Sequence, residues 1–301
     1  MDLPIRKFSL NLLAWLHRSR RRRLSFIKRY AYKDIKRATD GFHRIVYSNN
    51  HSAAYKAKFR DGGIVLVKEI TDINQEKEVF YREVQLLGCL HHRHLLTLRG
   101  FSFGHKKRLL VFDNVENGSL KEHLNDPLRT PLNWRTRLQI ATGVVAALEY
   151  LLLFNDPPIY HVSINSSNIM LDENFNAKLS DIGIVTSTGD NETMPHTSCS
   201  KDSMDQECSN IIYQLGVLIL ELVTGQSSDN GDADLVQWIQ ESRFRNSIHN
   251  MIDPDLGNTY DNRELRSLLA VAKLCIVSRE KPTFSVLQIF RYFQKKVEIP
   301  Q

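Results

Sequence analysis

The sequence has no uninterrupted apolar run near the ~18 residues that a membrane-spanning helix needs. Its only cysteines are far apart and lack metal-ligand spacing, which argues against a disulfide scaffold or a zinc site: Cys89, Cys199, Cys208 and Cys275. Glycine and proline are not in excess, and 42% of the residues are hydrophobic, so we expect a globular protein in a reducing compartment.

The positive charge of the chain is confined to its first residues. Residues 1–30 hold nine lysines and arginines and one acidic residue, a net charge of +8. The remaining residues hold 31 basic and 33 acidic side chains, a net charge of −2. A nucleic-acid-binding surface on the globular body is therefore not supported.

Residues 1–30 place apolar side chains at helical spacing, and a run of arginines follows from Arg20 to Arg23. This pattern favours an amphipathic helix on an anionic membrane surface. A solvated basic tail and a nuclear-import patch stay open as alternatives. Asp2 excludes N-myristoylation, and charge that follows the apolar stretch is atypical of a secretory signal.

The body changes character along the chain. The segment "AAYKAKFRDGGIVLVKEI" predicts two strands joined at Asp61-Gly62-Gly63. "EKEVFYREVQLLGCL" has helical periodicity and "RLLVFDNV" a buried-strand pattern, whereas "RLQIATGVVAALEYLLL" and "NIIYQLGVLILELVTG" predict buried core helices. We expect an α+β, bilobal protein with a tail (1–30), a strand-rich lobe (31–115) and a helical lobe (116–298).

Several phrases, in this order, resemble the kinase domain of plant receptor-like kinases: "YAYKDIKRATDGF", "LHHRHLLTLRGF", "LLVFDNVENGSLKEHL", "NSSNIMLDENFNAKLSDIG" and "LGVLILELVTG". The resemblance covers about residues 30 to 298. It implies the protein-kinase fold and a cleft that binds ATP and Mg²⁺. Because a fold does not fix a function, each catalytic part has to be compared with its chemical task.

Part of the catalytic set is present. By resemblance, Lys68 is the lysine that contacts the ATP phosphates and pairs with a helix glutamate, Glu83. An ion pair that only holds the helix in place is the alternative. Asn168 and Asp181 match the two Mg²⁺ ligands. The resemblance assigns the adenine pocket to Leu66, Asp113, Val115 and Met170, with Phe112 as gatekeeper.

Other parts of the catalytic set are lost. The glycine-rich phosphate loop reads "YSNNHS" at 47–52, without glycine. Ser163 replaces the catalytic aspartate and Asn165 the catalytic lysine, so a base and a positive charge are both missing. Val162 and Ile211 replace the polar residues that support the catalytic loop, which predicts that apolar packing has replaced a polar network.

The activation segment departs from the family as well. Thr186 to Ser209 lack the motif that grips a substrate peptide, and Lys281 replaces its arginine partner. Before its last residue, Ser209, the segment carries eight hydroxyl residues, which could be targets of another kinase or an inert polar loop: Thr186, Ser187, Thr188, Thr193, Thr197, Ser198, Ser200 and Ser203.

These observations favour a catalytically impaired receptor-like kinase that acts in plant signalling by contact with an active receptor-like kinase. A weak or unconventional serine/threonine kinase that uses Lys68, Asn168 and Asp181 is the first alternative, and a degenerating duplicate without a selected role is the second. We expect a cytoplasmic location, with the tail as the contact to the inner face of the plasma membrane.

Overall fold

The computed structural model describes residues 27–48, 52–70, 77–104, 107–183, 201–227, 233–240, 251–257, 259–279 and 285–297. These residues form two compact units. The strand unit comprises the described residues of 27–91 and 97–114, and the helical unit those of 92–96, 115–183 and 201–297. The expected order, a strand-rich first third before helices, is confirmed.

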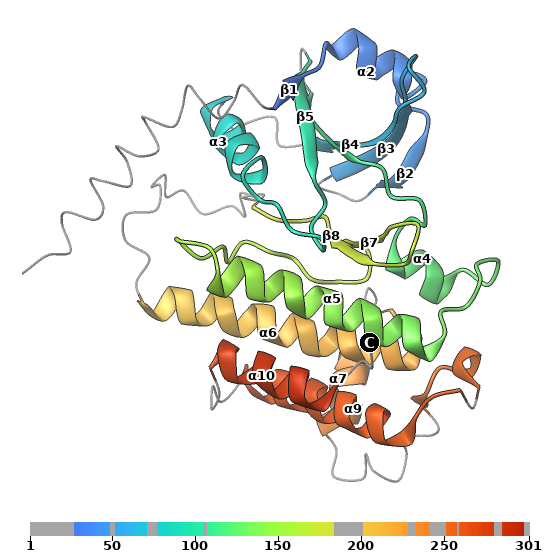
Figure 1. The fold of residues 1–301 in the computed structure, drawn as a ribbon, viewed down its shortest axis with the longest axis vertical. Helices are drawn as coiled ribbons and strands as arrows, with labels where there is room; N and C mark the ends of the chain where they lie inside the picture. Colours follow the sequence, from blue (N-terminus) through green and yellow to red (C-terminus); the bar gives the residue numbers. More distant parts are fainter. Residues whose placement is uncertain are drawn as a thin grey trace, which may run out of the picture. The chain divides into compact units, whose positions relative to one another are not determined.

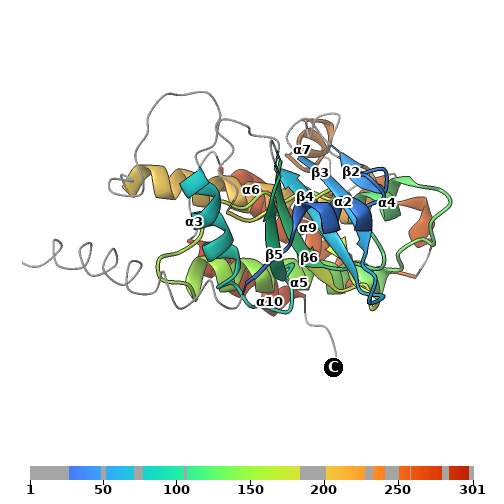
Figure 2. The ribbon, with the colours of Figure 1, turned by 90° about the horizontal axis from the view of Figure 1, so that it is seen from above.

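The strand unit is built on one mixed sheet of six strands in the order β1-β5-β6-β4-β3-β2, most of which can be followed in Figure 2. β1 runs parallel to β5 and the other neighbours are antiparallel. The predicted hairpin is present, and Gly62 at its turn has a φ of 87°, a left-handed conformation that favours glycine. The strands are β1 (Lys28–Arg29), β2 (Ile45–Ser48), β3 (Ser52–Lys58), β4 (Ile64–Ile70), β5 (Leu98–Phe103) and β6 (Arg108–Asp113).

Two helices of the strand unit pack on apolar side chains of the sheet. On α3 (Lys77–Leu87), the fully buried Phe80 lies edge-on to Phe103 of β5, with ring centroids 4.9 Å apart. On α2 (Tyr32–Ala38), the fully buried Ile35 packs in a cluster with Val67 and Val111 of β4 and β6. Burial of these side chains stabilises the sheet against both helices.

The elements of the helical unit are α4 (Leu120–Asn125), α5 (Trp134–Leu153), β7 (Ile169–Leu171), β8 (Ala177–Leu179), α6 (Lys201–Thr224), α7 (Ala233–Gln240), the 3-10 helix η3 (Pro254–Leu256), α9 (Asn262–Val277) and α10 (Val286–Lys296). The two long helices α5 and α6 are at the centre of the unit, beside α9 and α10 (Figure 1). The short hairpin of β7 and β8 lies against α5.

α5 and α6 are the predicted core helices. Windows within Trp134–Leu153 and Asp205–Thr224 are long and apolar enough to cross a membrane, so the expectation that no segment meets this criterion is wrong. However, 61% and 67% of these windows are buried inside the structure. Core helices satisfy the same criterion because they are apolar nearly all round. Their burial indicates a role in the core of the helical unit.

A buried ion pair joins three segments of the helical unit. Arg137 of α5 is 1% exposed, and its guanidinium donates to Asp253 Oδ2 at 2.6 Å. The same group donates to the Leu132 carbonyl and to the Leu222 carbonyl, each at 2.9 Å. Each of the three guanidinium nitrogens therefore donates a hydrogen bond, and such bonds are the condition for tolerating a buried ion.

We predict that Arg137→Met destabilises the protein by about 3–5 kcal/mol, because Asp253 would become a buried carboxylate without its cation. Arg135→Met is the matched control, since Arg135 lies on the same helix but is exposed, and we expect a change within about 0.5 kcal/mol. Urea unfolding of the three proteins measures both values. Equal stabilities for the two variants would contradict this role of Arg137.

Candidate functional site

The β7–β8 hairpin brings the two predicted metal ligands together. Its register pairs Ile169 with Leu179, so the residues that flank the hairpin, Asn168 and Ser180, lie opposite each other. Ser180 donates to the Asn168 carbonyl from its backbone N–H at 3.0 Å and from its hydroxyl at 2.8 Å. The next residue, Asp181, accepts a hydrogen bond from the Asn168 side-chain amide, Nδ2 to Oδ2, at 3.3 Å.

The catalytic-loop sequence lies beside Asp181. The backbone N–H of Ser163 donates to the Asp181 carbonyl at 3.2 Å, and the N–H of Gly183 donates to the His161 carbonyl at 2.7 Å. Val162 and Ile182 form an isolated antiparallel bridge between these bonds. Ser163 and Asp181 are therefore held near each other by the backbone, independently of their side chains.

Asn168 is the centre of the side-chain contacts. Its Nδ2 also donates to Ser163 Oγ at 3.1 Å, and its backbone N–H donates to Asn165 Oδ1 at 2.9 Å. Asn165 Nδ2 reaches Ser163 Oγ at 3.5 Å. The four predicted residues of this unit are thus neighbours: Ser163, Asn165, Asn168 and Asp181. Only Asp181 among them can carry a charge at neutral pH.

Two side chains of α6 support the catalytic loop. Gln214 Oε1 accepts a hydrogen bond from the backbone N–H of Ile164 at 2.7 Å. Ser166, which is fully buried, donates to Glu221 Oε1 at 3.3 Å. Ile211 is buried at 2% exposure, as its apolar character predicts. The expectation that apolar packing had wholly replaced the polar support is therefore wrong, because Gln214 and Glu221 still bond to the loop.

The segment expected to be a polar loop is partly helical. Residues 186–200 lie outside the described residues, but α6 begins at Lys201, so the stretch from 201 to 209 belongs to a helix. This part of α6 contacts Tyr160, two residues before Val162. Burial, with Cys208 and the acidic Asp205 and Glu207 nearby, raises the pKa of the Tyr160 phenol. The helical extension therefore packs against the start of the catalytic loop.

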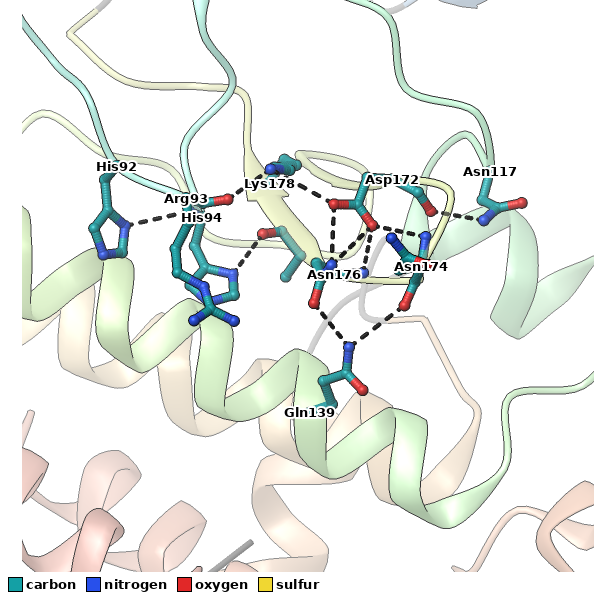
Figure 3. A network of polar contacts seen from close by, with 10 residues as sticks. His92, Arg93, His94, Asn117, Gln139, Asp172, Asn174, Asn176 and Lys178 are labelled. Carbon is teal, nitrogen blue, oxygen red and sulfur yellow. Dashed lines mark hydrogen bonds and ion pairs between the residues drawn. The ribbon is translucent and has the colours of Figure 1, made fainter. Parts of the chain in front are cut away.

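A polar network fixes the turn between β7 and β8 (Figure 3). The Asp172 carboxylate accepts from the backbone N–H groups of Asn174 and Asn176 at 3.0 and 2.9 Å. Asn176 also accepts from Gln139 of α5, Nε2 to Oδ1, at 2.8 Å. Burial would raise the Asp172 pKa, but the bonds from Asn176 and Asn174 hold it below its usual value. The network anchors the hairpin that carries Asn168 and Asp181 to α5.

Residues 92–96 of the helical unit are anchored to the same hairpin. His94 Nδ1 is 3.0 Å from the Ala177 carbonyl, and Lys178 Nζ donates to the Arg93 carbonyl at 2.6 Å (Figure 3). The His92 ring stacks on Tyr150 of α5, with centroids 5.0 Å apart. Burial, with Arg93 and Lys178 nearby, lowers the pKa of both histidines, although the carbonyl contact of His94 acts in the opposite direction.

Except for Asp113, which is half-buried, the remaining site residues are buried in their own units. In the strand unit, Lys68 of β4 is 4% exposed and Glu83 of α3 is 5% exposed. Leu66 is buried, and Asp113 forms an ion pair with Arg99. In the helical unit, Val115 and Met170 are also buried. The nucleotide roles of these residues stay predictions. The side chains of the phosphate-loop residues 47–52, the tail 1–26 and Lys281 lie outside the described residues.

Comparison with known proteins decides the family. Residues 46–252 match the family model described as protein tyrosine and serine/threonine kinase. A probable receptor-like protein kinase of Arabidopsis thaliana is 36% identical over 285 residues, which cover 89% of this chain and 43% of that protein. Calcium/calmodulin-regulated receptor-like kinase 1 of the same plant is 31% identical, over 93% of this chain and 68% of the relative. The chain belongs to the plant receptor-like kinase family.

Solved structures agree with this assignment. The pseudokinase domain of BIR2, an immune regulator of the RLK/Pelle family, is 28% identical to this receptor-like kinase chain with a TM-score of 0.74, covering 89% of this chain and 84% of its own. The pseudokinase DRIK1 (drought responsive inactive kinase 1), at 21% identity and a TM-score of 0.70 over 91% and 98% of the two chains, shares the fold. The predicted bilobal kinase fold is confirmed. Because the chain spans 43% of the first relative's length, the activity of a whole receptor does not carry over.

Sequence reasoning missed Gln214, Glu221 and the Asp172 network. Gln214 and Glu221 interrupt the apolar run "NIIYQLGVLILELVTG", and a polar residue in such a run must find a buried partner. That signal could have marked both residues. Their partners, 50 and 55 residues away, could not be read from the same stretch.

We predict that acidification weakens the helical unit through His92 and His94. Their pKa values lie below the ordinary value of 6.5 in the folded state, so the unfolded chain takes up protons first. The histidine contribution is complete above about pH 6.5 and is lost as the pH falls below it. Denaturant unfolding at about pH 7.5 and about pH 5.5 measures this loss.

His94→Asn removes one titrating group, while its amide can still donate to the Ala177 carbonyl. We expect this variant to lose less stability on acidification than the unmodified chain. His43→Asn is the control, since His43 is exposed in the strand unit. We expect this control to lose as much stability on acidification as the unmodified chain. An acid-induced loss in His94→Asn as large as in the unmodified chain would refute the assignment.

Proposed function

We propose that this receptor-like kinase chain is catalytically impaired and regulates an active receptor-like kinase by direct contact. The observation that carries the proposal is how the hydroxyl of Ser163 is hydrogen-bonded. Its hydroxyl stands where the family has a carboxylate, and it accepts hydrogen bonds from the Asn168 and Asn165 amides. A serine bound in this way is neutral and structural, since an alcohol does not act as a base at neutral pH.

The chemical deficit concerns both charge and proton transfer. Phosphoryl transfer needs a group that orients the attacking hydroxyl and takes its proton, and Ser163 cannot take it. It also needs a cation near the transferred phosphoryl group, and Asn165 is an uncharged amide whose oxygen accepts the Asn168 backbone N–H. A missing general base alone slows a reaction by about 10²–10⁴-fold. The loss of the cation adds to this deficit.

ATP and Mg²⁺ are the usual ligands of this family, and the residues fit them in part. Asp181 and Asn168 offer a carboxylate and an amide oxygen, the oxygen donors that Mg²⁺ takes. Bound Mg²⁺ would neutralise phosphate charge there, and Lys68 would contact the phosphates. The sequence at 47–52 supplies no glycine for close approach to phosphate. We therefore propose weak, metal-dependent nucleotide binding, with Leu66, Asp113, Val115 and Met170 at the adenine.

A regulatory role is supported by the state of the fold. The hydrophobic cores of both units are formed, and the loop that held the chemistry is fully supported by α6 and β8. The similar BIR2 domain is a pseudokinase and an immune regulator. A stable surface without efficient catalysis suits docking to a kinase partner. The eight hydroxyl residues from Thr186 to Ser203 are the candidate targets of that partner.

One observation favours the alternative of a weak serine/threonine kinase. Asn168 and Asp181, the metal-binding pair, lie side by side at 3.3 Å even though the catalytic aspartate is lost. A slow transfer that depends on Lys68 and Asp181 would follow from that geometry. The two functions differ in rate, so a rate measurement separates them.

We predict no phosphotransfer to peptide or to the chain itself within tenfold of the ~1–100 s⁻¹ of ordinary kinases. Purified full-length protein with labelled ATP and Mg²⁺ gives the rate, and thermal shift in the same buffers reports nucleotide binding. Lys68→Ala should remove any shift. Transfer within tenfold of the ordinary range, abolished by Asp181→Ala, would contradict the proposal, whereas slower transfer that Asp181→Ala abolishes would establish the alternative.

We also predict that the chain co-purifies with an active receptor-like kinase from plant tissue after stimulation. The partner should phosphorylate one or more of the eight hydroxyl residues, because the segment that carries them lacks the rigid motif that grips a substrate peptide. Phosphopeptide mapping identifies them, and replacement of all eight by alanine is the matched control. No kinase partner together with no phosphate on these residues would leave only the degenerating duplicate.

A further inference from the structure

The charge of the folded body is divided unequally between the two units. The described residues of the strand unit hold 15 lysines and arginines and seven acidic residues, a net charge of +8. Those of the helical unit hold 14 and 17, a net charge of −3. Lys28 and Arg29 belong to the tail counted above, and without them the described strand unit still has 13 basic and seven acidic residues, a net charge of +6. The near-neutral total of the body therefore hides a basic folded unit that follows the basic tail in the sequence.

Four cations of the strand unit gather just before β2, along β3 and in the turn that follows β3, and we call them the cationic edge: Arg44, Lys56, Lys58 and Arg60. Lys56 donates its backbone N–H to the Arg44 carbonyl at 2.9 Å, so the two residues are neighbours across adjacent strands. Lys56 and Lys58 are two residues apart on β3 and point to one face of the sheet. All four residues are exposed.

One exposed isoleucine accompanies these cations. Ile64 pairs with Lys58 across β3 and β4, so both side chains lie on the same face, and Ile64 is 40% exposed. Ile45, the first residue of the outermost strand β2, is 60% exposed, but it pairs with Tyr55 and therefore lies on the opposite face from Lys56 and Lys58. Among the described residues of the strand unit, these two are the exposed large hydrophobic side chains. Ile64 alone lies on the face of the two lysines.

The cationic edge is not neutralised by the described part of the protein. Within the residues that the structure describes, no ion pair joins any of its four cations to a carboxylate. The nearest acidic residue along the chain is Asp61, whose carboxylate accepts the Gly63 backbone N–H at 3.0 Å. Elsewhere in the strand unit, Arg37, Arg82, Arg99 and Lys107 each have an acidic partner.

We propose that the cationic edge is a membrane-contact surface that binds anionic lipid headgroups. Exposed cations attract an anionic bilayer, and the exposed Ile64 beside them can enter the interfacial layer. The chain itself favours this occupant over an acidic protein, because residues 1–26 carry seven basic residues, one acidic residue and apolar side chains at helical spacing. A weak electrostatic anchor needs a second contact for stable binding. The cationic edge supplies that contact from the folded domain.

The proposal is tested in the full chain with residues 1–26 neutralised by replacing Lys7, Arg18, Arg20, Arg21, Arg22 and Arg23 with glutamine, which leaves Arg6 and Asp2. The probes are vesicles of phosphatidylcholine with and without phosphatidylserine. The edge variant carries Arg44→Gln, Lys56→Gln and Lys58→Gln. The matched control carries Arg291→Gln, Lys295→Gln and Lys296→Gln on α10, which removes the same charge from exposed positions of the helical unit.

Each basic residue at an anionic membrane surface strengthens binding by about fivefold. We therefore expect the edge variant to bind phosphatidylserine vesicles at least about tenfold more weakly than its parent, and the α10 control to change by less than about twofold. Binding should fall with salt. Ile64→Ser, which leaves the charge unchanged, should weaken binding about threefold by removing apolar area. Unchanged thermal unfolding temperatures would show that the variants are folded.

Three results would overturn the proposal. The tail-neutralised chain could fail to bind phosphatidylserine vesicles. The edge variant and the α10 control could lose equal affinity, which would mean that only total charge matters. The edge could bind a polyglutamate peptide and no vesicle, which would assign it to an acidic protein segment. None of these results bears on phosphotransfer, so the proposed regulatory function is tested separately.

Discussion

The buried guanidinium of Arg137 is the constraint on which the helical unit depends. It joins α5 to the Leu222 carbonyl near the end of α6 and to Asp253 before η3. Gly225, with a φ of 70°, makes this approach possible, because a β-carbon there would collide with the Asp253 carboxylate. Each guanidinium nitrogen donates to a fixed acceptor, so the charge favours one arrangement of these segments. The position of α6 relative to α5 follows from it.

The position of α6 in turn fixes the catalytic loop. Gln214 lies two turns before Glu221 on α6, and the two side chains reach the loop at Ile164 and Ser166. The loop then holds residues 181–183, which follow β8, through a backbone bond from Ser163 to Asp181 and one from Gly183 to His161. The buried ion pair thus positions α6, and α6 in turn supports the loop, without a contribution from any catalytic group. A chain can keep these contacts after its catalytic activity is lost.

Much of this arrangement could be predicted from local patterns. The β3–β4 hairpin, the core helices and the meeting of Asn168 with Asp181 follow from periodicity, turn residues and resemblance. The bond from Ile164 to Gln214 could not be predicted, because a side chain's partner 50 residues away depends on helix packing. The start of α6 at Lys201 was missed because serine, aspartate and asparagine favour turns as well as helix starts. There, Asp202 and Asp205 near the first turn favour the helix.

The exchange of aspartate for serine at position 163 shows how stability and chemistry separate. The side-chain amide of Asn168, which is 8% exposed, needs acceptors, and losing one would leave a buried donor unsatisfied. Ser163 Oγ supplies an acceptor at 3.1 Å, so the hydrogen-bond network around the loop stays complete. The charge that catalysis needs is absent, yet the folded state loses little. Substitutions of this kind can accumulate in a kinase domain whose selected property is its surface. The backbone that once aligned substrates then serves to keep that surface in shape.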